Sequence, residues 1–436
     1  MSVKMKLECE LISKEIIKPS SPTPDHLRHY KLSFLDQISP PVYNPLLLFY
    51  ETDGETKFNS VEKYNQLKQS LSQALIHFYP LAGRIKDNHF VDCNDEGIPC
   101  LQAKVSGKLS DVVQSPVPTE IKKLLPFELD QDQELPLGVQ FNIFECGGIC
   151  IGLCLSHNIG DALSIVLFVK IWAAITRGEE EITRPEFVSA KLFPPKDFSG
   201  FNPRIGFAKE NVLTERFVFK SSSIESLRAK YAASTSLKSQ RPPSRVEALS
   251  AFIWTRFMAA IKQQTEEPSE KIYMMLHAVN LRTRMNPPLP ENSFGNFYRV
   301  AMTFPSPTNN GEESNYDDIV IQMRDSISKI DTEYVKKLQE AGNDEHMDFI
   351  KQMAQFFMRG EMVSLNFTSL CRFPLYETDF GWRKPIWVGS PSLTFKNLVV
   401  FMDTPSGDGI EALIHLNQED MQKFKEDQEL LQFVSC

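Results

Sequence analysis

The sequence predicts a mixed α/β fold divided into two halves. Apolar residues spaced by three and four, typical of helices, alternate along the chain with strand-like spacings of two. Near residues 187–206 both patterns give way to turn-rich sequence, which indicates a linker. The length of 436 residues allows two or three domains. An apolar fraction of 42%, a charged fraction of 24% and a mean hydropathy of −0.26 are ordinary for a globular protein.

The first half shows a clear order of elements. Apolar residues between 67 and 78 fall on one face of a helix that Pro80 should end. Residues 138–156 read as strand with a break at Gly147-Gly148. A second apolar helix is expected from about Asp161 to Thr176.

The second half begins with strand-like residues 216–219 and continues with a helix whose start is well specified. Ser244 and Glu247 form a capping box, with a hydroxyl and a carboxylate three positions apart, and Pro242-Pro243 precede it. Apolar positions at helical spacing follow, from Val246 to Ile261. A longer amphipathic helix is expected near 316–340, and two final strands near 396–402 and 409–416.

The composition limits the cellular setting and the partners. The N-terminal residues include no apolar signal-peptide core, and no stretch approaches the roughly 18 apolar residues of a membrane-spanning helix. Eight cysteines are too few for a disulfide-rich scaffold. We therefore expect a cytoplasmic protein with free thiols and no membrane partner. The absence of a heptad pattern favours a monomer.

Charge is unevenly distributed along the chain. The net charge of −9 argues against a nucleic-acid partner, yet residues 201–285 carry 14 basic and seven acidic residues, an excess of +7. The helix start at Ser244, with Arg245 beside it, would suit a phosphate group because helix N-termini attract anions. The alternative is that these charges are simply solvated at the surface.

One histidine is a candidate for catalysis. His157 precedes Asp161 by four residues, where a strand is expected to end and a helix to begin. A neutral imidazole can act as a general base near pH 7, although the bare spacing also occurs by chance and a structural histidine is the alternative. A metal site of Cys150, Cys154 and His157 is not expected, because strand residues four apart are about 13 Å apart.

Several segments together resemble the BAHD family of plant coenzyme A-dependent acyltransferases, and within it the indole-alkaloid acetyltransferases. They occur in the family's order over nearly the whole chain. The segments typical of the family are His77–Arg84 (HFYPLAGR), Ser156–Asp161 (SHNIGD), Ala278–Arg284 (AVNLRTR), Phe294–Asn296 (FGN) and Asp379–Trp382 (DFGW). Those similar to the alkaloid group are Lys18–Pro24, Leu35–Gln37, Val91–Asp95, Phe144–Gly148 and Asn286–Pro290.

The resemblance implies two similar-sized domains of chloramphenicol-acetyltransferase-like fold, with the active-site channel between them. The expected boundaries are 1–186 for the half with His157, 187–206 for the linker, and 207–436 for the half that carries Asp379–Trp382 and the main coenzyme A surface. The resemblance further implies direct acyl transfer from acyl-coenzyme A, most simply acetyl-coenzyme A, to a hydroxyl group of an alkaloid or similar metabolite, with no metal.

The resemblance also assigns roles to residues. His157 would be the general base, Asp161 its organiser paired with Arg282, and Asp379 a loop residue described as structural or catalytic. Phe380, Gly381 and Trp382 would support the site. Asn296 is a candidate donor to the oxyanion, and Ser244 and Arg245 are candidate coenzyme A contacts.

Arg383 departs from the pattern, because the family commonly has glycine there. If that position has a positive φ, arginine adds strain of order 1 kcal/mol. The alternatives are a cation for coenzyme phosphate or a preference for a charged donor such as malonyl. Two other functions therefore stay open: transfer of malonyl or a larger acyl group, and a catalytically degraded paralogue that only binds ligand.

Overall fold

The computed structural model describes residues 6–51, 60–130, 134–196, 212–233, 241–262, 271–305, 317–340, 355–356 and 359–435. Their contacts divide the chain into two compact units. The first contains Met1–Arg204, Leu289–Phe297 and Phe373–Ser392, and the second contains Ile205–Pro288, Tyr298–Arg372 and Leu393–Cys436. Both helices and strands are present in each unit, as the mixed α/β prediction requires.

The division of the units differs from the expected boundaries in two respects. The first unit extends through most of the expected linker, 187–206, to Arg204. Everything after residue 207 was assigned to the second half, but two later segments pack with the first unit, and one of them carries Asp379–Trp382. The physical reason is aromatic packing. Phe380 is fully buried, and its ring centroid lies 4.9 Å from that of Trp172. A single division point along the sequence cannot describe these units, because the chain re-enters the first unit after it has begun the second.

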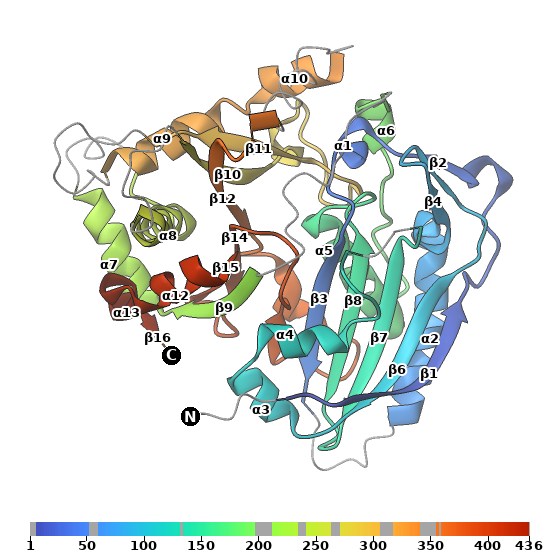
Figure 1. Cartoon of the computed structure of the whole chain (residues 1–436). Helices are drawn as coiled ribbons and strands as arrows, with labels where there is room; N and C mark the ends of the chain where they lie inside the picture. Colours follow the sequence, from blue (N-terminus) through green and yellow to red (C-terminus); the bar gives the residue numbers. More distant parts are fainter. Residues whose placement is uncertain are drawn as a thin grey trace. The chain divides into compact units, whose positions relative to one another are not determined.

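The first unit is built on a six-stranded sheet in the order β1-β6-β7-β8-β3-β13, and Figure 1 shows β1, β6, β7, β8 and β3 side by side. These strands are β1 (Cys9–Ile17), β6 (Ile98–Val105), β7 (Leu137–Phe144), β8 (Ile149–Ser156), β3 (Tyr43–Tyr50) and β13 (Trp387–Gly389). A small sheet contains β2 (His29–Lys31), β5 (Phe90–Asp92) and β4 (Arg84–Lys86). The helices are α1 (Phe34–Gln37), α2 (Ser60–His77), α3 (Leu109–Gln114), α4 (Pro118–Ile121), α5 (Ala162–Thr176) and α6 (Ser189–Leu192).

Strand β8 positions the candidate histidine. All eight of its residues are buried, which explains why its sequence is almost continuously apolar. A Cβ atom at Gly152 would lie 2.0 Å from the carbonyl oxygen of Leu124, so only glycine permits this close approach. The β7–β8 hairpin turns at Gly147, which has a φ of +85°. The predicted strand pair and its glycine break are therefore confirmed.

The second unit contains a seven-stranded sheet in the order β11-β10-β12-β14-β15-β9-β16. Its strands are β11 (Tyr298–Thr303), β10 (Ile272–Asn280), β12 (Met362–Ser369), β14 (Leu398–Asp403), β15 (Ile410–Asn417), β9 (Val212–Phe219) and β16 (Val434–Ser435). Its helices are α7 (Ser221–Ala232), α8 (Arg245–Lys262), α9 (Asp317–Ser328), α10 (Thr332–Glu340), α12 (Gln418–Glu426) and α13 (Gln428–Phe433). None of the helices within the described ranges is long and apolar enough to cross a membrane.

Helix α8 confirms the predicted apolar face, because Leu249, Phe252 and Phe257 are all buried in the core of this unit. The single helix expected near 316–340 is instead two helices, α9 and α10. The break falls at Asp331, whose Oδ1 accepts a hydrogen bond from the backbone N–H of Tyr334 at 2.8 Å. A capping carboxylate therefore starts a new helix there.

Candidate active site

His157 lies directly beyond the end of β8. Its backbone N–H donates to the carbonyl oxygen of Val42 at 2.8 Å, and Ser156 pairs with Tyr43 of β3. His157 is half-buried, and its partial desolvation lowers its pKa below the ordinary value. The charge of Asp161 and a hydrogen bond to Asn296 oppose this effect. The imidazole is therefore neutral at pH 7, as a general base must be.

Asn296 determines which ring nitrogen carries the proton. Its side-chain N–H groups donate to the carbonyl oxygen of His157 at 2.7 Å and to Oδ1 of Asp36 at 2.8 Å. Its Oδ1 therefore faces Nδ1 of His157, at 3.1 Å. Because an amide oxygen only accepts, Nδ1 must carry the hydrogen, and the lone pair of the neutral ring lies on Nε2.

The same geometry argues against the expected role of Asn296 as a donor to the oxyanion. Both side-chain N–H groups are already donated, and its backbone N–H donates to Oδ1 of Asp36 at 3.0 Å. Donating to an oxyanion would break one of these bonds. Asn296 is instead placed to orient the ring of His157.

Asp161 holds backbone groups with both of its oxygens. Its Oδ1 accepts from the backbone N–H of Ser164 at 3.0 Å, which makes it the N-cap of α5 and confirms the predicted helix start. Its Oδ2 accepts from the backbone N–H of Phe297 at 3.0 Å. This carboxylate links the start of α5 to the 294–297 segment. Arg282 is also buried, but it belongs to the second unit, and its ion pair with Asp161 stays a prediction.

The Asp379–Trp382 segment is a turn held by one carboxylate oxygen. Oδ1 of Asp379 accepts from the backbone N–H groups of Gly381, Trp382 and Arg383, at 2.7, 3.0 and 3.0 Å. Its carbonyl oxygen accepts from the guanidinium of Arg177, at the end of α5. Gly381 has a φ of +90°, and Arg383 has a φ of +112°. The condition under which arginine adds strain at this position, a positive φ, is therefore met.

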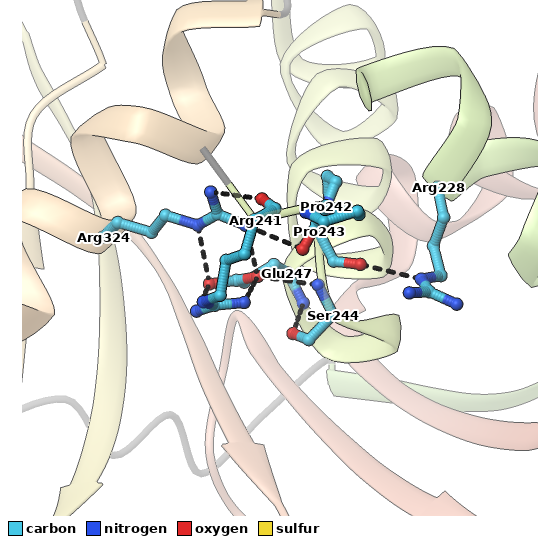
Figure 2. Close-up of polar contacts among 7 residues, drawn as sticks. All are labelled: Arg228, Arg241, Pro242, Pro243, Ser244, Glu247 and Arg324. Atoms are coloured by element: carbon cyan, nitrogen blue, oxygen red, sulfur yellow. Dashed lines mark hydrogen bonds and ion pairs between the residues drawn. The ribbon is translucent and has the colours of Figure 1, made fainter. Parts of the chain in front are cut away.

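Ser244 and Arg245 already have partners within the second unit. Figure 2 shows the capping box: the backbone N–H of Ser244 donates to Glu247 at 2.7 Å, and Oγ of Ser244 accepts from the N–H of Glu247 at 3.1 Å. Glu247 also pairs with Arg241 and Arg324. Arg245 pairs with Asp403 at 2.8 Å and keeps 22% of its side chain exposed.

Sequence reasoning did not single out Asp36, which contacts Asn296 and was quoted only within the segment Leu35–Gln37. The local signal was Ser33-x-x-Asp36, a capping-box spacing at the start of α1. The contact with Asn296 could not be read in this way, because 260 residues separate the two positions. Within the part of the chain that the structure describes, no three histidine, cysteine, aspartate or glutamate side chains lie close enough together to bind a metal ion.

The chain is similar to known enzymes over nearly its full length. The model of the Transferase family matches residues 7–431. Stemmadenine O-acetyltransferase of Catharanthus roseus is 36% identical over 433 residues, covering 97% of both chains. A limonoid 21-O-acetyltransferase of Melia azedarach is 36% identical over 435 residues, covering 98% of this chain and 99% of that protein.

The fold agrees with a solved structure from the same group. The crystal structure of vinorine synthase superposes with a TM-score of 0.83 at 34% identity, covering 98% of this chain and 99% of that chain. The extent of these matches exceeds what a shared fold alone would give. The chain belongs to the Transferase family of BAHD acyltransferases and is an acyltransferase enzyme.

Proposed function

We propose that the protein transfers an acyl group, most simply acetyl, from acyl-coenzyme A to a hydroxyl group of a plant alkaloid, limonoid or similar specialised metabolite. The observation that carries this proposal is the half-buried, neutral His157, whose Nδ1–H donates to Asn296 at 3.1 Å and whose lone pair lies on Nε2. The names of the similar enzymes, a stemmadenine O-acetyltransferase and a limonoid 21-O-acetyltransferase, support acetyl as the transferred group and an oxygen atom of an alkaloid or limonoid as the acceptor.

The chemistry requires a base because an alcohol is too weak an acid to ionise near pH 7. Nε2 of His157 takes the hydroxyl proton as the alcohol oxygen attacks the thioester carbonyl carbon. The resulting tetrahedral intermediate collapses, the carbon–sulfur bond breaks, and His157 returns the proton to the departing thiolate. The charge of Asp161 raises the pKa of His157 against the effect of burial, so it favours the imidazolium that forms in between.

Coenzyme A carries several phosphate charges, and we include Ser244 and Arg245 among its contacts. The hydroxyl oxygen of Ser244 accepts the cap hydrogen bond, which leaves its own hydrogen to be donated to a phosphate. Arg245 would have to share its guanidinium between the phosphate and Asp403. Arg282 is retained as the proposed partner of Asp161.

The test uses the purified protein with acetyl- and malonyl-coenzyme A and a panel of alkaloid and limonoid alcohols. His157→Ala should lower kcat by about 10²–10⁴-fold, the range that a general base supplies. His26→Ala is the matched control, because His26 is exposed and should leave turnover unchanged. Ester formation that survives His157→Ala would contradict its role as base. No turnover with any donor, together with tight ligand binding, would favour a degraded binding protein.

A further inference from the structure

Asp36 is a fully buried carboxylate that the reaction described above does not use. It lies in α1, and hydrogen-bond donors surround both of its oxygens. Oδ2 accepts from the backbone N–H and Oγ of Ser33, at 2.8 and 2.6 Å, and from Oγ of Ser189 at 3.5 Å. Oδ1 accepts from the backbone N–H and Nδ2 of Asn296, at 3.0 and 2.8 Å.

The bonds to Asn296 have a consequence for His157. An amide side chain can rotate by half a turn, which would exchange its oxygen with its NH₂ group. In the rotated form the NH₂ group would face Nδ1 of His157, and the ring would have to carry its hydrogen on Nε2. That tautomer has no lone pair on Nε2 with which to take a proton.

Two acceptors oppose this rotation, the carbonyl oxygen of His157 and the carboxylate of Asp36. The bond to Asp36 is charge-assisted, and such bonds are about twice as strong as neutral ones. The rotated amide would also place its oxygen against a carboxylate oxygen in a buried site. We propose that Asp36 is a positioning residue, whose carboxylate holds Asn296 in the orientation that keeps the His157 proton on Nδ1.

The competing explanation is that Asp36 only completes the capping box of α1. The backbone N–H of Asp36 donates to Oγ of Ser33 at 3.1 Å, and Asp36 returns the bond to the N–H of Ser33. Ser33→Ala separates the two explanations. It removes the hydroxyl of the cap and leaves the contact between Asp36 and Asn296 in place.

The experiment is a double-mutant cycle in kcat and KM with Asp36→Asn, Asn296→Ala and the two combined. Asp36→Asn should lower kcat about tenfold or more and leave the KM of both substrates within about twofold, because Asp36 is fully buried. In the Asn296→Ala background the same change should alter kcat by less than about threefold, since the residue through which it acts is gone. Ser33→Ala should lower the melting temperature and keep kcat.

A spectroscopic measurement accompanies the cycle. Nitrogen-15 NMR of histidine-labelled protein reports which ring nitrogen is protonated, and the His157 signal is identified by its loss in His157→Ala. Wild type and Ser33→Ala should show the Nδ1–H form, whereas Asp36→Asn should show a mixture. If Asp36→Asn does not fold, Asp36→Ser replaces it. Wild-type kcat and tautomer in a folded Asp36 variant, or losses that multiply in the cycle, would overturn the proposal.

The inference rests on the proposed role of His157, and the same panel keeps the two apart. Turnover by His157→Ala would remove the base itself. An inactive His157→Ala beside a fully active Asp36→Asn would overturn only the role of Asp36.

Discussion

At the scale of single residues, the carboxylates of the two sequence motifs, Asp161 and Asp379, accept hydrogen bonds from backbone N–H groups. Asp161 joins the N–H groups of Ser164 and Phe297, and Asp379 gathers three consecutive N–H groups of its own turn. The residue that orients the imidazole is Asn296, which lies 139 positions away in sequence. Family resemblance therefore supplied the proposed base and its proposed organiser, but not Asn296 as the hydrogen-bond partner of the ring.

Arg383 gives a prediction at this scale. Its φ of +112° is outside the regions that L-residues favour, which costs about 1–2 kcal/mol. Glycine would remove this strain but lose about 0.5–1 kcal/mol through its greater freedom in the unfolded chain. Arg383→Gly should therefore raise the melting temperature slightly, by about 1–3 °C. Calorimetry measures this, and acetyl- and malonyl-coenzyme A assays measure donor choice, which should not change.

The matched control is Lys384→Gly. Lys384 is adjacent to Arg383, its φ is not positive, and its side chain pairs with Glu377. This variant should be less stable than the wild type. A lower melting temperature in Arg383→Gly would contradict the strain argument. A changed donor preference would instead make Arg383 a residue that selects the acyl group.

At the scale of elements, the start of α8 shows how one local motif can organise a larger cluster. Ser244 and Glu247 form the predicted capping box, and Glu247 also accepts from the guanidinium groups of Arg241 and Arg324 (Figure 2). Burial alone would raise the pKa of Glu247, but hydrogen bonds from Arg324 and Arg241 lower it to about 2. The carboxylate therefore ties α9 and the segment before α8 to the N-terminus of α8.

This arrangement predicts two graded losses of stability. Ser244→Ala should cost about 1 kcal/mol, the usual value of an N-cap. Glu247→Gln should cost about 2 kcal/mol, because it weakens several charged hydrogen bonds around Arg324, whose side chain is only 12% exposed. Urea unfolding followed by tryptophan fluorescence measures both, with Trp254 of α8 as the local probe.

Ser222→Ala in α7 is the control, because Ser222 is exposed and does not occupy the N-cap. It should change the free energy of unfolding by less than about 0.5 kcal/mol. Equal effects of Ser222→Ala and Ser244→Ala would contradict the contribution of the cap.

The helices and strands that sequence predicted well share one property, which is that their signals are local. The capping box at Ser244, the glycine turn at Gly147 and the apolar face of α8 each depend on residues within a few turns of one another. The break between α9 and α10 was missed because both helices continue one amphipathic pattern. The contact of Asp331 with the backbone N–H of Tyr334 marks the start of the second helix.

At the scale of the whole molecule, the excess of positive charge in residues 201–285 has partners that a linear count could not show. Arg216 forms a bidentate ion pair with Glu411. Two further ion pairs join Arg245 to Asp403 and Arg256 to Glu429. All three acids lie outside that segment but within the same unit. The excess is therefore partly neutralised in the fold, and it supports a phosphate site less than the sequence suggested.

Sequence analysis also could not show that segments late in the chain pack with the first unit. Asn296 and Asp379 follow the linker in sequence, yet both belong to the first unit with His157. Hydrogen bonds and aromatic contacts between residues far apart in sequence produce this arrangement, and periodicity carries no information about them. Family resemblance supplied the motif residues, whereas Asp36 emerged only from three-dimensional contacts.

Buried histidines make the stability of the folded protein depend on pH. Burial lowers the pKa of His277 and His415 to about 4. The unfolded chain therefore binds these protons first as the pH falls from 6.5 towards 4, and the folded state loses stability over that window. Asp36 acts in the opposite direction, because burial raises its pKa to about 6 despite hydrogen bonds from Ser33 and Asn296. Its contribution to stability grows as the pH falls from 6 to 3.8.

His415 is the better residue for testing this effect. Its ring is fully buried, with Nδ1 3.1 Å from the carbonyl oxygen of Leu398, whereas His277 lines a cavity of about 290 Å³ where a charged ring could be hydrated. His415→Gln should keep a donor for Leu398 and remove the titration. The loss of stability between pH 7 and pH 4.5 should then be smaller by about 2 kcal/mol than in the wild type. Urea midpoints at the two pH values measure the difference. The exposed His26→Gln should retain the wild-type loss, and an equal loss in His415→Gln and wild type would show that this buried ring does not set the acid sensitivity.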